Sequence, residues 1–294
     1  MQKFSQVSIE TEKRLAPLLS DFLLGMGSLG VAEDIKKDDL FEVTAYFPID
    51  DDLNELIEKL RNFIKFLEYS YNNASLSEIK VQHIDKSHWM VWRNLLTTVK
   101  VTNNVYIKPP WEQIEVKDDQ YIIEINPSLA FGTGHHETTQ LCIRAIEKLC
   151  SESTLNSSLD VGCGSGILSI CTAKFGMKIC IGLDIDLNAV KQSYNNSKVN
   201  KTVANTMFYC GHLHSVNEKF DLVLANISVE AILSLKFELK SRMTERGYLV
   251  ISGIPHIRTN EVVEGLSSID LMIKEIIRDG DWIMAILYKS NLGD

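Results

Sequence analysis

A glycine-rich loop between an apolar strand and an apolar helix constrains this chain more than any other feature. Residues 160–166 read Asp-Val-Gly-Cys-Gly-Ser-Gly and are followed by Ile167-Leu168-Ser169-Ile170. Gly162, Gly164 and Gly166 can take positive φ angles and, because they lack a Cβ atom, let the backbone come close to a ligand. A strand, a glycine loop and a helix in this order are typical of α/β domains that bind a nucleotide-like cofactor. The alternative is a glycine turn in an unrelated α/β domain.

The spacing of the glycines favours S-adenosylmethionine over a dinucleotide. A dinucleotide loop of the G-x-G-x-x-G type needs its third glycine at the position that Ile167 occupies, which disfavours an NAD-dependent oxidoreductase. The G-x-G-x-G spacing suits S-adenosylmethionine, because this cofactor has no pyrophosphate to bind. Eighteen residues after Gly166, the apolar strand 179–183 ends in Asp184, and this carboxylate is placed to accept hydrogen bonds from both ribose hydroxyls.

Length and composition indicate a globular protein with two domains. The chain has 294 residues, of which 45% are hydrophobic, and a domain has about 150 residues on average. No apolar run approaches the roughly 18 residues that span a membrane, and the N-terminus lacks the apolar core of a signal peptide. The six cysteines lack C-x-x-C spacing, which predicts reduced core thiols. We therefore expect a cytoplasmic protein without membrane association.

The first 85 residues alternate strand and helix patterns in the order βαββαβ. Strands are expected at 7–9, 29–35, 41–47 and 78–84, and helices at 11–26 and 53–67. This order is that of a ferredoxin-like α+β domain. The segment contains 9 Lys and Arg against 16 Asp and Glu, so it carries −7 of the total charge of −9. Such a surface disfavours direct nucleic-acid binding and attracts a basic protein. The alternative is that the acidic residues serve solubility alone.

The rest of the chain divides into a linker and a second domain. Residues 86–119 have no clear period and contain three of the four tryptophans, which predicts a linker that packs on another surface. From residue 120 onward, strand and helix patterns alternate as in a doubly wound, mostly parallel sheet. We therefore expect a ferredoxin-like substrate-recognition domain over residues 1–85, a linker over 86–119 and a cofactor-binding α/β domain over 120–294.

Three motifs give the chain a family resemblance. Residues 126–139, Asn-Pro-Ser-Leu-Ala-Phe-Gly-Thr-Gly-His-His-Glu-Thr-Thr, resemble the P-x-L-A-F-G-T-G-T-H-P-T-T signature of the methyltransferases that modify protein eleven of the large ribosomal subunit. The glycine loop with Gly182 to Asp186, and Ala225-Asn226-Ile227, also resemble this family. The resemblance spans almost the whole chain. It implies a seven-stranded methyltransferase sheet, S-adenosylmethionine as cofactor and that basic ribosomal protein as substrate.

The resemblance also implies individual cofactor contacts. Phe131 and the glycines after it would cover the cofactor, and Thr139 would contact its amino-acid end. The expected cofactor-binding set is Phe131, Thr139, Gly162, Gly164, Gly166, Asp184 and Asn226. His135-His136-Glu137 replaces the family's Thr-His-Pro, which leaves the fine substrate choice open. Adjacent histidines in a strand or helix cannot both face one metal ion, so we expect no metal site and instead a loop that enters a helix, with Glu137 near the helix dipole.

Asn226 is the expected catalytic residue. It follows the apolar strand 220–225 at its carboxyl end, where open α/β sheets bind ligands. Its side-chain carbonyl and the following backbone carbonyl can accept hydrogen bonds from an amine and aim the amine's lone pair at the sulfonium methyl group. The family's Asn-Ile-Leu-Ala reads Asn226-Ile227-Ser228-Val229 here. The alternative is that Asn226 caps a helix that begins near Val229.

The expected reaction is methyl transfer to lysine side chains, to an N-terminal amine, or to both. Deprotonating a lysine of pKa about 10.4 at pH 7 costs about 4–5 kcal/mol, and no general base is evident in the sequence. We therefore expect positioning and desolvation of the amine to provide the catalysis. The alternatives are an N-methyltransferase that acts on another protein or a small molecule, and a binding factor without turnover. The sequence does not determine which amines are modified, how many methyl groups each amine receives, or the oligomeric state.

Overall fold

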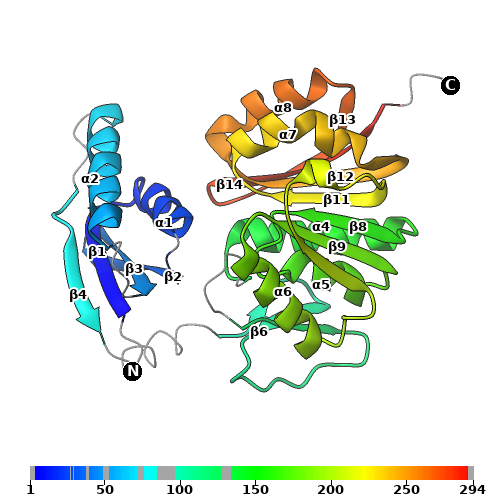
Figure 1. The fold of residues 1–294 in the computed structure, drawn as a ribbon, viewed down its shortest axis with the longest axis horizontal. Coiled ribbons are helices and arrows are strands. Elements are labelled where there is room, and N and C mark those ends of the chain that lie inside the picture. The colour runs from blue at the N-terminus through cyan, green and yellow to red at the C-terminus, as the bar shows by residue number, and fades with distance from the viewer. Residues whose placement is uncertain are drawn as a thin grey trace. The chain divides into compact units, whose positions relative to one another are not determined.

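The chain folds as two compact units, each with hydrophobic core residues of its own. The computed structural model describes residues 4–26, 28, 30–37, 40–48, 53–71, 76–84, 97–126 and 134–290. The chain separates into two units, Met1–Leu96 and Thr97–Asp294 (Figure 1).

The first unit is a four-stranded antiparallel sheet with two helices. Its elements are β1 (Phe4–Glu12), α1 (Ala16–Gly25), β2 (Gly30–Lys37), β3 (Leu40–Pro48), α2 (Leu53–Ser70) and β4 (Lys80–Ile84). The strand order is β2-β3-β1-β4, and both β3 and β4 pair antiparallel with β1. One core joins Val7 and Ile9 of β1 to apolar side chains of β3 and of both helices. The predicted ferredoxin-like domain is thereby confirmed.

Strand β1 is longer than its apolar pattern indicates. The sequence predicts a strand at 7–9 and a helix from residue 11, whereas β1 continues to Glu12 and α1 begins at Ala16. Glu12 lies opposite Leu40 of β3 in the sheet register. Pairing with β3 therefore extends the strand over residues whose helical spacing favoured a helix.

The second unit is built on a seven-stranded sheet. Its strands are β8 (Ser157–Val161), β9 (Ile179–Asp184), β10 (Thr206–Cys210), β11 (Phe220–Asn226), β12 (Met243–Pro255), β13 (Leu271–Asp279) and β14 (Trp282–Lys289). The strand order is β10-β9-β8-β11-β12-β14-β13, and β14 pairs antiparallel with both of its neighbours. The pairs from β10 to β12 are parallel. The predicted doubly wound, mostly parallel sheet of seven strands is confirmed.

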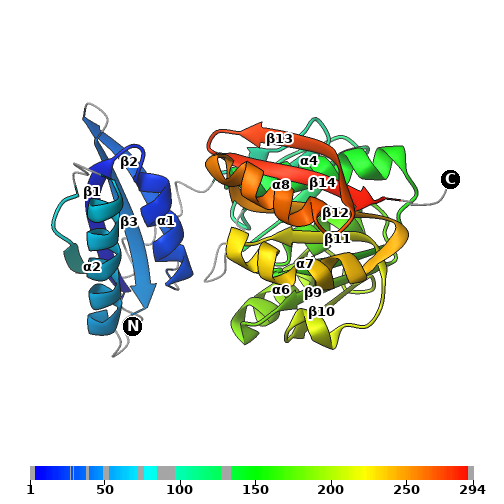
Figure 2. The same ribbon diagram turned by 90° about the horizontal axis from the view of Figure 1, so that it is seen from above.

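Helices cover both faces of this sheet. They are α4 (Glu137–Glu152), α5 (Ile167–Lys174), α6 (Leu187–Val199), α7 (Val229–Ser241) and α8 (Thr259–Ser267), with short 3-10 helices at Leu213–Ser215 and His256–Arg258. Leu222 and Leu224 of β11 lie in the core beneath α4 and α5, whereas Val223 and Ala225 lie in the core beneath α7 and α8. Figure 1 shows α7 and α8 on one side of the sheet and α5 and α6 on the other, and Figure 2 views the sheet from the side of α7 and α8. Burial on both faces explains why β11 is an unbroken apolar run.

The order of the strands reverses at β8. From β8 the chain passes through β9 to β10, and it then returns to β11 on the other side of β8. The carboxyl ends of β8 and β11 therefore flank a topological switch point, which is where open α/β sheets bind their ligands.

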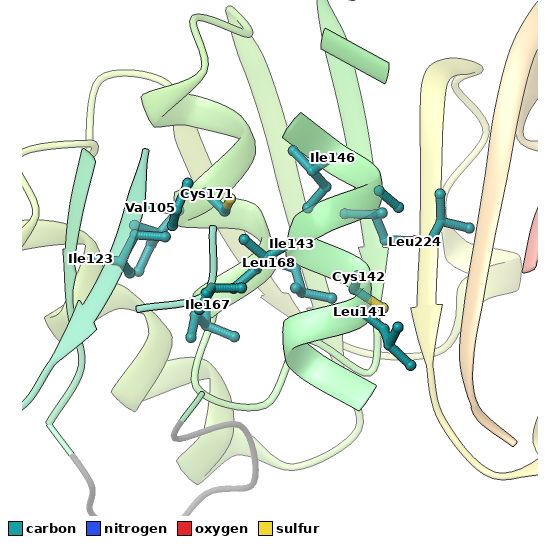
Figure 3. Packing of buried hydrophobic residues seen from close by; sticks show 14 of the residues in the cluster. Val105, Ile123, Leu141, Cys142, Ile143, Ile146, Ile167, Leu168, Cys171 and Leu224 are labelled. Carbon is teal, nitrogen blue, oxygen red and sulfur yellow. The ribbon is translucent and has the colours of Figure 1, made fainter. Parts of the chain in front are cut away.

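The segment from residue 97 to residue 125 belongs to the second unit. Strands β5 (Val99–Lys100), β6 (Val105–Lys108) and β7 (Tyr121–Glu124) form a three-stranded sheet. Val105 and Ile123 share a core with Leu168 and Cys171 of α5 (Figure 3). The predicted linker of residues 86–119 is therefore too long at its C-terminal end, because the second unit begins at Thr97 and not at residue 120. Trp89 and Trp92 lie outside the described residues.

Candidate active site

The glycine loop lies at the switch point, between the end of β8 and the start of α5. Gly162, Gly164 and Gly166 have φ angles of 72°, 53° and 78°, so all three take the left-handed conformation that the sequence predicts. The backbone amides of Gly162 and Cys163 donate hydrogen bonds of 2.8 and 3.0 Å to the carbonyl oxygen of Leu183. These bonds fix the loop to the end of β9.

Protein contacts explain the missing side chain at two of the three glycines. A Cβ atom on Gly162 would lie 2.6 Å from Cγ2 of Ile227, and one on Gly166 would lie 2.6 Å from Cβ of Ser193. Both distances are shorter than real carbon contacts, so an alanine at either position would displace its neighbour. The expectation that all three glycines serve ligand approach is therefore too simple, because Gly162 and Gly166 also allow α6 and the segment after β11 to pack against the loop.

Asp184 stands at the end of β9 and faces the loop. Its Oδ2 atom accepts a hydrogen bond of 2.9 Å from the Gly164 amide, and its Oδ1 atom accepts one of 2.9 Å from the Asp186 amide. A carboxylate has about four acceptor positions, so these two bonds leave capacity for further donors. Asp184 can therefore hold the glycine loop and still accept hydrogen bonds from ribose hydroxyls.

Asn226 lies at the end of β11 with one half of its side-chain amide unpaired. Its Nδ2 atom donates a hydrogen bond of 3.4 Å to Oγ1 of Thr139 at the start of α4. Its Oδ1 atom is buried and has no hydrogen-bond partner in the described part of the chain. A buried carbonyl oxygen without a partner is costly, and a donor on a bound ligand would satisfy it.

Asn226 is not the cap of the following helix. Helix α7 begins at Val229, and its N-cap is Ser228, whose Oγ atom accepts a hydrogen bond of 3.3 Å from the Ala231 amide. The alternative interpretation of Asn226 as a helix cap is therefore wrong.

The start of α4 carries the histidines of the 126–139 motif. His136 is the N-cap of α4, because its Nδ1 atom accepts a hydrogen bond of 3.3 Å from the Thr138 amide. Burial lowers the pKa of His136, which favours the neutral imidazole that this cap requires, although the carboxylate of Glu137 opposes the shift. The Nε2 atom of His135 lies 2.9 Å from the carbonyl oxygen of Thr97. Both histidines therefore shape the entry of the helix, as expected, and Glu137 occupies its first turn.

Two further polar residues, to which the sequence assigns no role, also hold the loop. Asp160 of β8 is fully buried, and its Oδ2 atom accepts hydrogen bonds from the Ser169 hydroxyl at 2.9 Å and from the Ser169 amide at 3.2 Å. Burial raises the pKa of Asp160 to about 7, while the hydrogen bonds from Ser169 lower it. The sequence signal for this residue was an acid at the end of a buried strand.

Asn196 of α6 is the second of these residues. Its Nδ2 atom donates to the carbonyl oxygen of Ser165 at 2.9 Å, and its Oδ1 atom accepts from the Asn126 amide at 3.3 Å. One buried side chain thus connects the glycine loop to the residue where the 126–139 motif begins. Sequence reasoning missed Asn196, because a single polar residue on a helix gives no distinctive signal.

Phe131, predicted to cover the cofactor, lies outside the described residues. Within the described ranges, no group of three or more His, Cys, Asp and Glu side chains is arranged to hold a metal ion. No helix in the same part of the chain is both long and apolar enough to cross a membrane.

The assembled groups suit S-adenosylmethionine. The positive-φ turn at 162–166 offers a close approach to the cofactor's amino-acid end, and Asp184 retains acceptor capacity for the ribose. The unpaired Oδ1 atom of Asn226 adds an acceptor at the same edge of the sheet. All of these groups stand at the carboxyl ends of β8, β9 and β11, which are neighbouring strands of the sheet.

Comparison with known proteins identifies the family. The family model described as ribosomal protein L11 methyltransferase (PrmA) matches residues 3–290. The chain belongs to this family. A ribosomal protein L11 methyltransferase from Geobacter metallireducens is 32% identical over 299 residues, which cover 98% of both chains. One from Halalkalibacterium halodurans is 32% identical over 308 residues, which cover 97% of this chain and 98% of the relative.

A solved structure supports the same assignment. The crystal structure of ribosomal protein L11 methylase from Lactobacillus delbrueckii subsp. bulgaricus is 32% identical, with a TM-score of 0.62 over 66% of this chain and all of the other. Membership of the family confirms the resemblance read from the 126–139 motif. The protein is therefore a methyltransferase whose cofactor is S-adenosylmethionine, as the glycine spacing predicts.

Proposed function

We propose that this enzyme transfers methyl groups from S-adenosylmethionine to amino groups of ribosomal protein L11, at lysine side chains, at the N-terminal amine, or at both. Its relatives carry this substrate in their names. The observation that carries the proposal is the Oδ1 atom of Asn226, a buried acceptor that has no partner among the described residues. An incoming amine is the kind of donor that this atom lacks.

The proposed role of Asn226 is to position the amine. S-adenosylmethionine, when bound, supplies an electrophilic methyl group on a positively charged sulfur. The Oδ1 atom of Asn226 accepts a hydrogen bond from the amine and thereby directs its lone pair along the line of the bond that breaks. Thr139 holds the other end of the Asn226 amide at 3.4 Å, which fixes the orientation of the carbonyl. Orientation of this kind lowers the barrier, because the enzyme fixes the geometry before the chemical step.

The site also favours loss of the proton from the amine. A lysine ammonium must lose its proton before it attacks, at a cost of about 4–5 kcal/mol at pH 7. We infer that the bound amine is desolvated at this edge of the sheet, and desolvation disfavours a charged ammonium and therefore lowers its pKa. The neutral amide of Asn226 adds no negative charge that would hold the proton in place.

We propose that the first unit recruits the substrate. Residues 1–85 carry a net charge of −7 out of −9, and a basic ribosomal protein is attracted to such a surface. This unit has its own core, so it is able to act as a docking module joined to the catalytic unit. The alternative, acidity for solubility alone, predicts that substrate affinity does not depend on these residues.

We further propose that the enzyme works in the cytoplasm and binds neither nucleic acid nor membranes directly. The excess of acidic residues over basic ones, 39 against 30, supports the proposal that the enzyme does not bind nucleic acid directly. An acidic surface repels phosphate groups.

Methyl transfer to purified ribosomal protein L11 tests the proposal. The full-length enzyme is incubated with methyl-labelled S-adenosylmethionine and L11, and the product is mapped by mass spectrometry. Label on lysine or N-terminal amines of L11 is the expected result. Label that appears on other proteins or on small molecules of a cell extract, with none on L11, would favour the alternative N-methyltransferase. Cofactor binding without label on any acceptor would indicate a binding factor without turnover.

A further inference from the structure

The strand next to β11 carries an irregularity beside the proposed amine site. The register between β12 and β14 shifts between Ile251 and Ile254. Gly253 lies inside this shift with a φ angle of +80°, a conformation that residues with a side chain rarely adopt. Ser252, directly before it, is the residue opposite Asn226 in the pairing of β11 with β12. The distortion of β12 therefore faces the end of β11.

Gly253 packs directly on the peptide group of Ile227. A Cβ atom at position 253 would lie 2.5 Å from the carbonyl oxygen of Ile227, 3.1 Å from its carbonyl carbon and 3.2 Å from its nitrogen. These are backbone atoms, so no rotation of a side chain can relieve the overlap. A side chain at position 253 would move the peptide of Ile227, and that peptide is covalently joined to Asn226.

Ile227 is also held from the side of the cofactor loop. Its Cγ2 atom lies 2.6 Å from the position that a Cβ of Gly162 would take. Two glycines with positive φ, one in the loop and one in β12, thus enclose the residue after Asn226. Its side chain contacts the loop, and its peptide contacts β12.

We propose that Gly253 is a positioning residue for methyl transfer. It holds the backbone of Ile227, and through it that of Asn226, at the distance from the glycine loop that aims the amine at the methyl group. The inference rests on the proposed role of Asn226 as the group that holds the amine. The reaction itself is the one proposed above, in which the amine nitrogen bonds to the methyl carbon as that carbon's bond to sulfur breaks.

Gly253→Ala and Gly176→Ala form a matched pair of test variants. Gly176 has a φ angle of +93°, but a Cβ atom there would meet nothing within 4 Å, and it lies between α5 and β9, away from the proposed site. Both variants carry the strain of an alanine at positive φ, and Gly253→Ala adds displacement of the Ile227 peptide. We expect Gly253→Ala to lower the single-turnover rate of methyl transfer to L11 by about 10², because a shift of about 1 Å costs that much. Its affinity for S-adenosylmethionine should stay within a few-fold of wild type, and Gly176→Ala should keep the wild-type rate per folded molecule.

Equal single-turnover rates for the two glycine variants would overturn the inference. If Gly253→Ala fails to fold, Ile227→Ala tests the positioning of the same residue from the side of the loop, because it removes the side-chain methyl group that lies against Gly162. The expected result is a turnover loss of at least tenfold with cofactor affinity kept, and an unchanged rate would overturn the inference.

Asn226→Ala and the double variant separate this inference from the proposed function. If Gly253 acts through Asn226, adding Gly253→Ala to Asn226→Ala should lower the rate little further. Wild-type turnover in Asn226→Ala would contradict the proposed function. Loss in Asn226→Ala with no loss in Gly253→Ala would contradict the positioning role alone.

Discussion

The side-chain amide of Asn226 is bound at one end and free at the other: its Nδ2 atom donates to the Thr139 hydroxyl at 3.4 Å, and its Oδ1 atom is buried with no partner among the described residues. Thr139 comes from α4 and Asn226 from β11, so two elements far apart in the sequence orient one carbonyl group. The next residue, Ile227, packs its side chain against Gly162 of the loop at 162–166.

Asp184→Ala should weaken the binding of S-adenosylmethionine more than tenfold. The variant removes the proposed acceptor for the ribose and the hydrogen bond from the Gly164 amide, and charge-assisted hydrogen bonds contribute about 1.5–3 kcal/mol each. Asp184→Asn should lose less, because it keeps one acceptor oxygen. Calorimetric titration measures both affinities.

Asp186→Ala is the control for that titration. Asp186 lies two residues further on and caps α6 by accepting a hydrogen bond of 2.8 Å from the Asn188 amide. Its loss should lower the melting temperature and leave cofactor affinity within a few-fold. Equal affinity losses in the alanine variants at 184 and 186 would remove Asp184 from the binding site.

The boundary at Thr97 predicts how shortened chains behave. A chain of residues 97–294 should fold and bind S-adenosylmethionine, whereas one of residues 120–294 should be unstable, since it lacks β5, β6 and the buried Val105 and Ile107. The longer fragment should also lose most methylation of L11, because it lacks the acidic first unit. Circular dichroism measures folding, calorimetry measures cofactor binding, and a methyl-transfer assay measures activity on L11. Full activity of 97–294 on L11 would show that the first unit is not needed for docking.

Buried Asp160 should make the stability of the enzyme depend on pH. Its pKa is raised to about 7 in the folded chain, above the ordinary value of 3.8, so the folded state holds this proton more tightly than the unfolded state does. The contribution of Asp160 to stability is complete below the ordinary pKa and is lost as the pH rises through the folded value. Asp160→Asn should therefore flatten the fall in unfolding free energy between about pH 4 and pH 7. Denaturant titrations at several pH values measure the slope, and parallel curves for the two proteins would contradict the prediction.

Motifs and long apolar periods allowed much of this fold to be predicted. The run from Phe220 to Ala225 indicated a buried strand, and Gly162, Gly164 and Gly166 indicated a left-handed turn, because both signals are local. Strands β5 and β6 have two and four residues, too few to show a period. They are strands because β6 pairs with β7 and β5 pairs with β6. A linker over those residues was therefore a reasonable but wrong expectation.

Parts of the site depend on contacts that no local pattern reveals. The sequence left open whether Asn226 caps α7, and the hydrogen bond from the Ala231 amide to Ser228 decides against it. Asn196 and Gly253 have no motif around them, although one connects the glycine loop to Asn126 and the other packs on Ile227. Their roles come from residues that the fold brings together from distant parts of the chain.

Single-turnover methyl transfer by Asn226 variants tests the central claim most directly. Asn226→Ala should lower the rate on L11 by about 10² or more, because the amine is no longer held in place, while cofactor affinity stays within a few-fold. Asn226→Asp should recover part of its activity as the pH rises, since a negative charge favours the protonated, unreactive amine. Ser228→Ala is the matched control: it removes the cap of α7, should cost about 1 kcal/mol of stability, and should leave turnover per folded molecule unchanged. A wild-type single-turnover rate in Asn226→Ala would contradict the account.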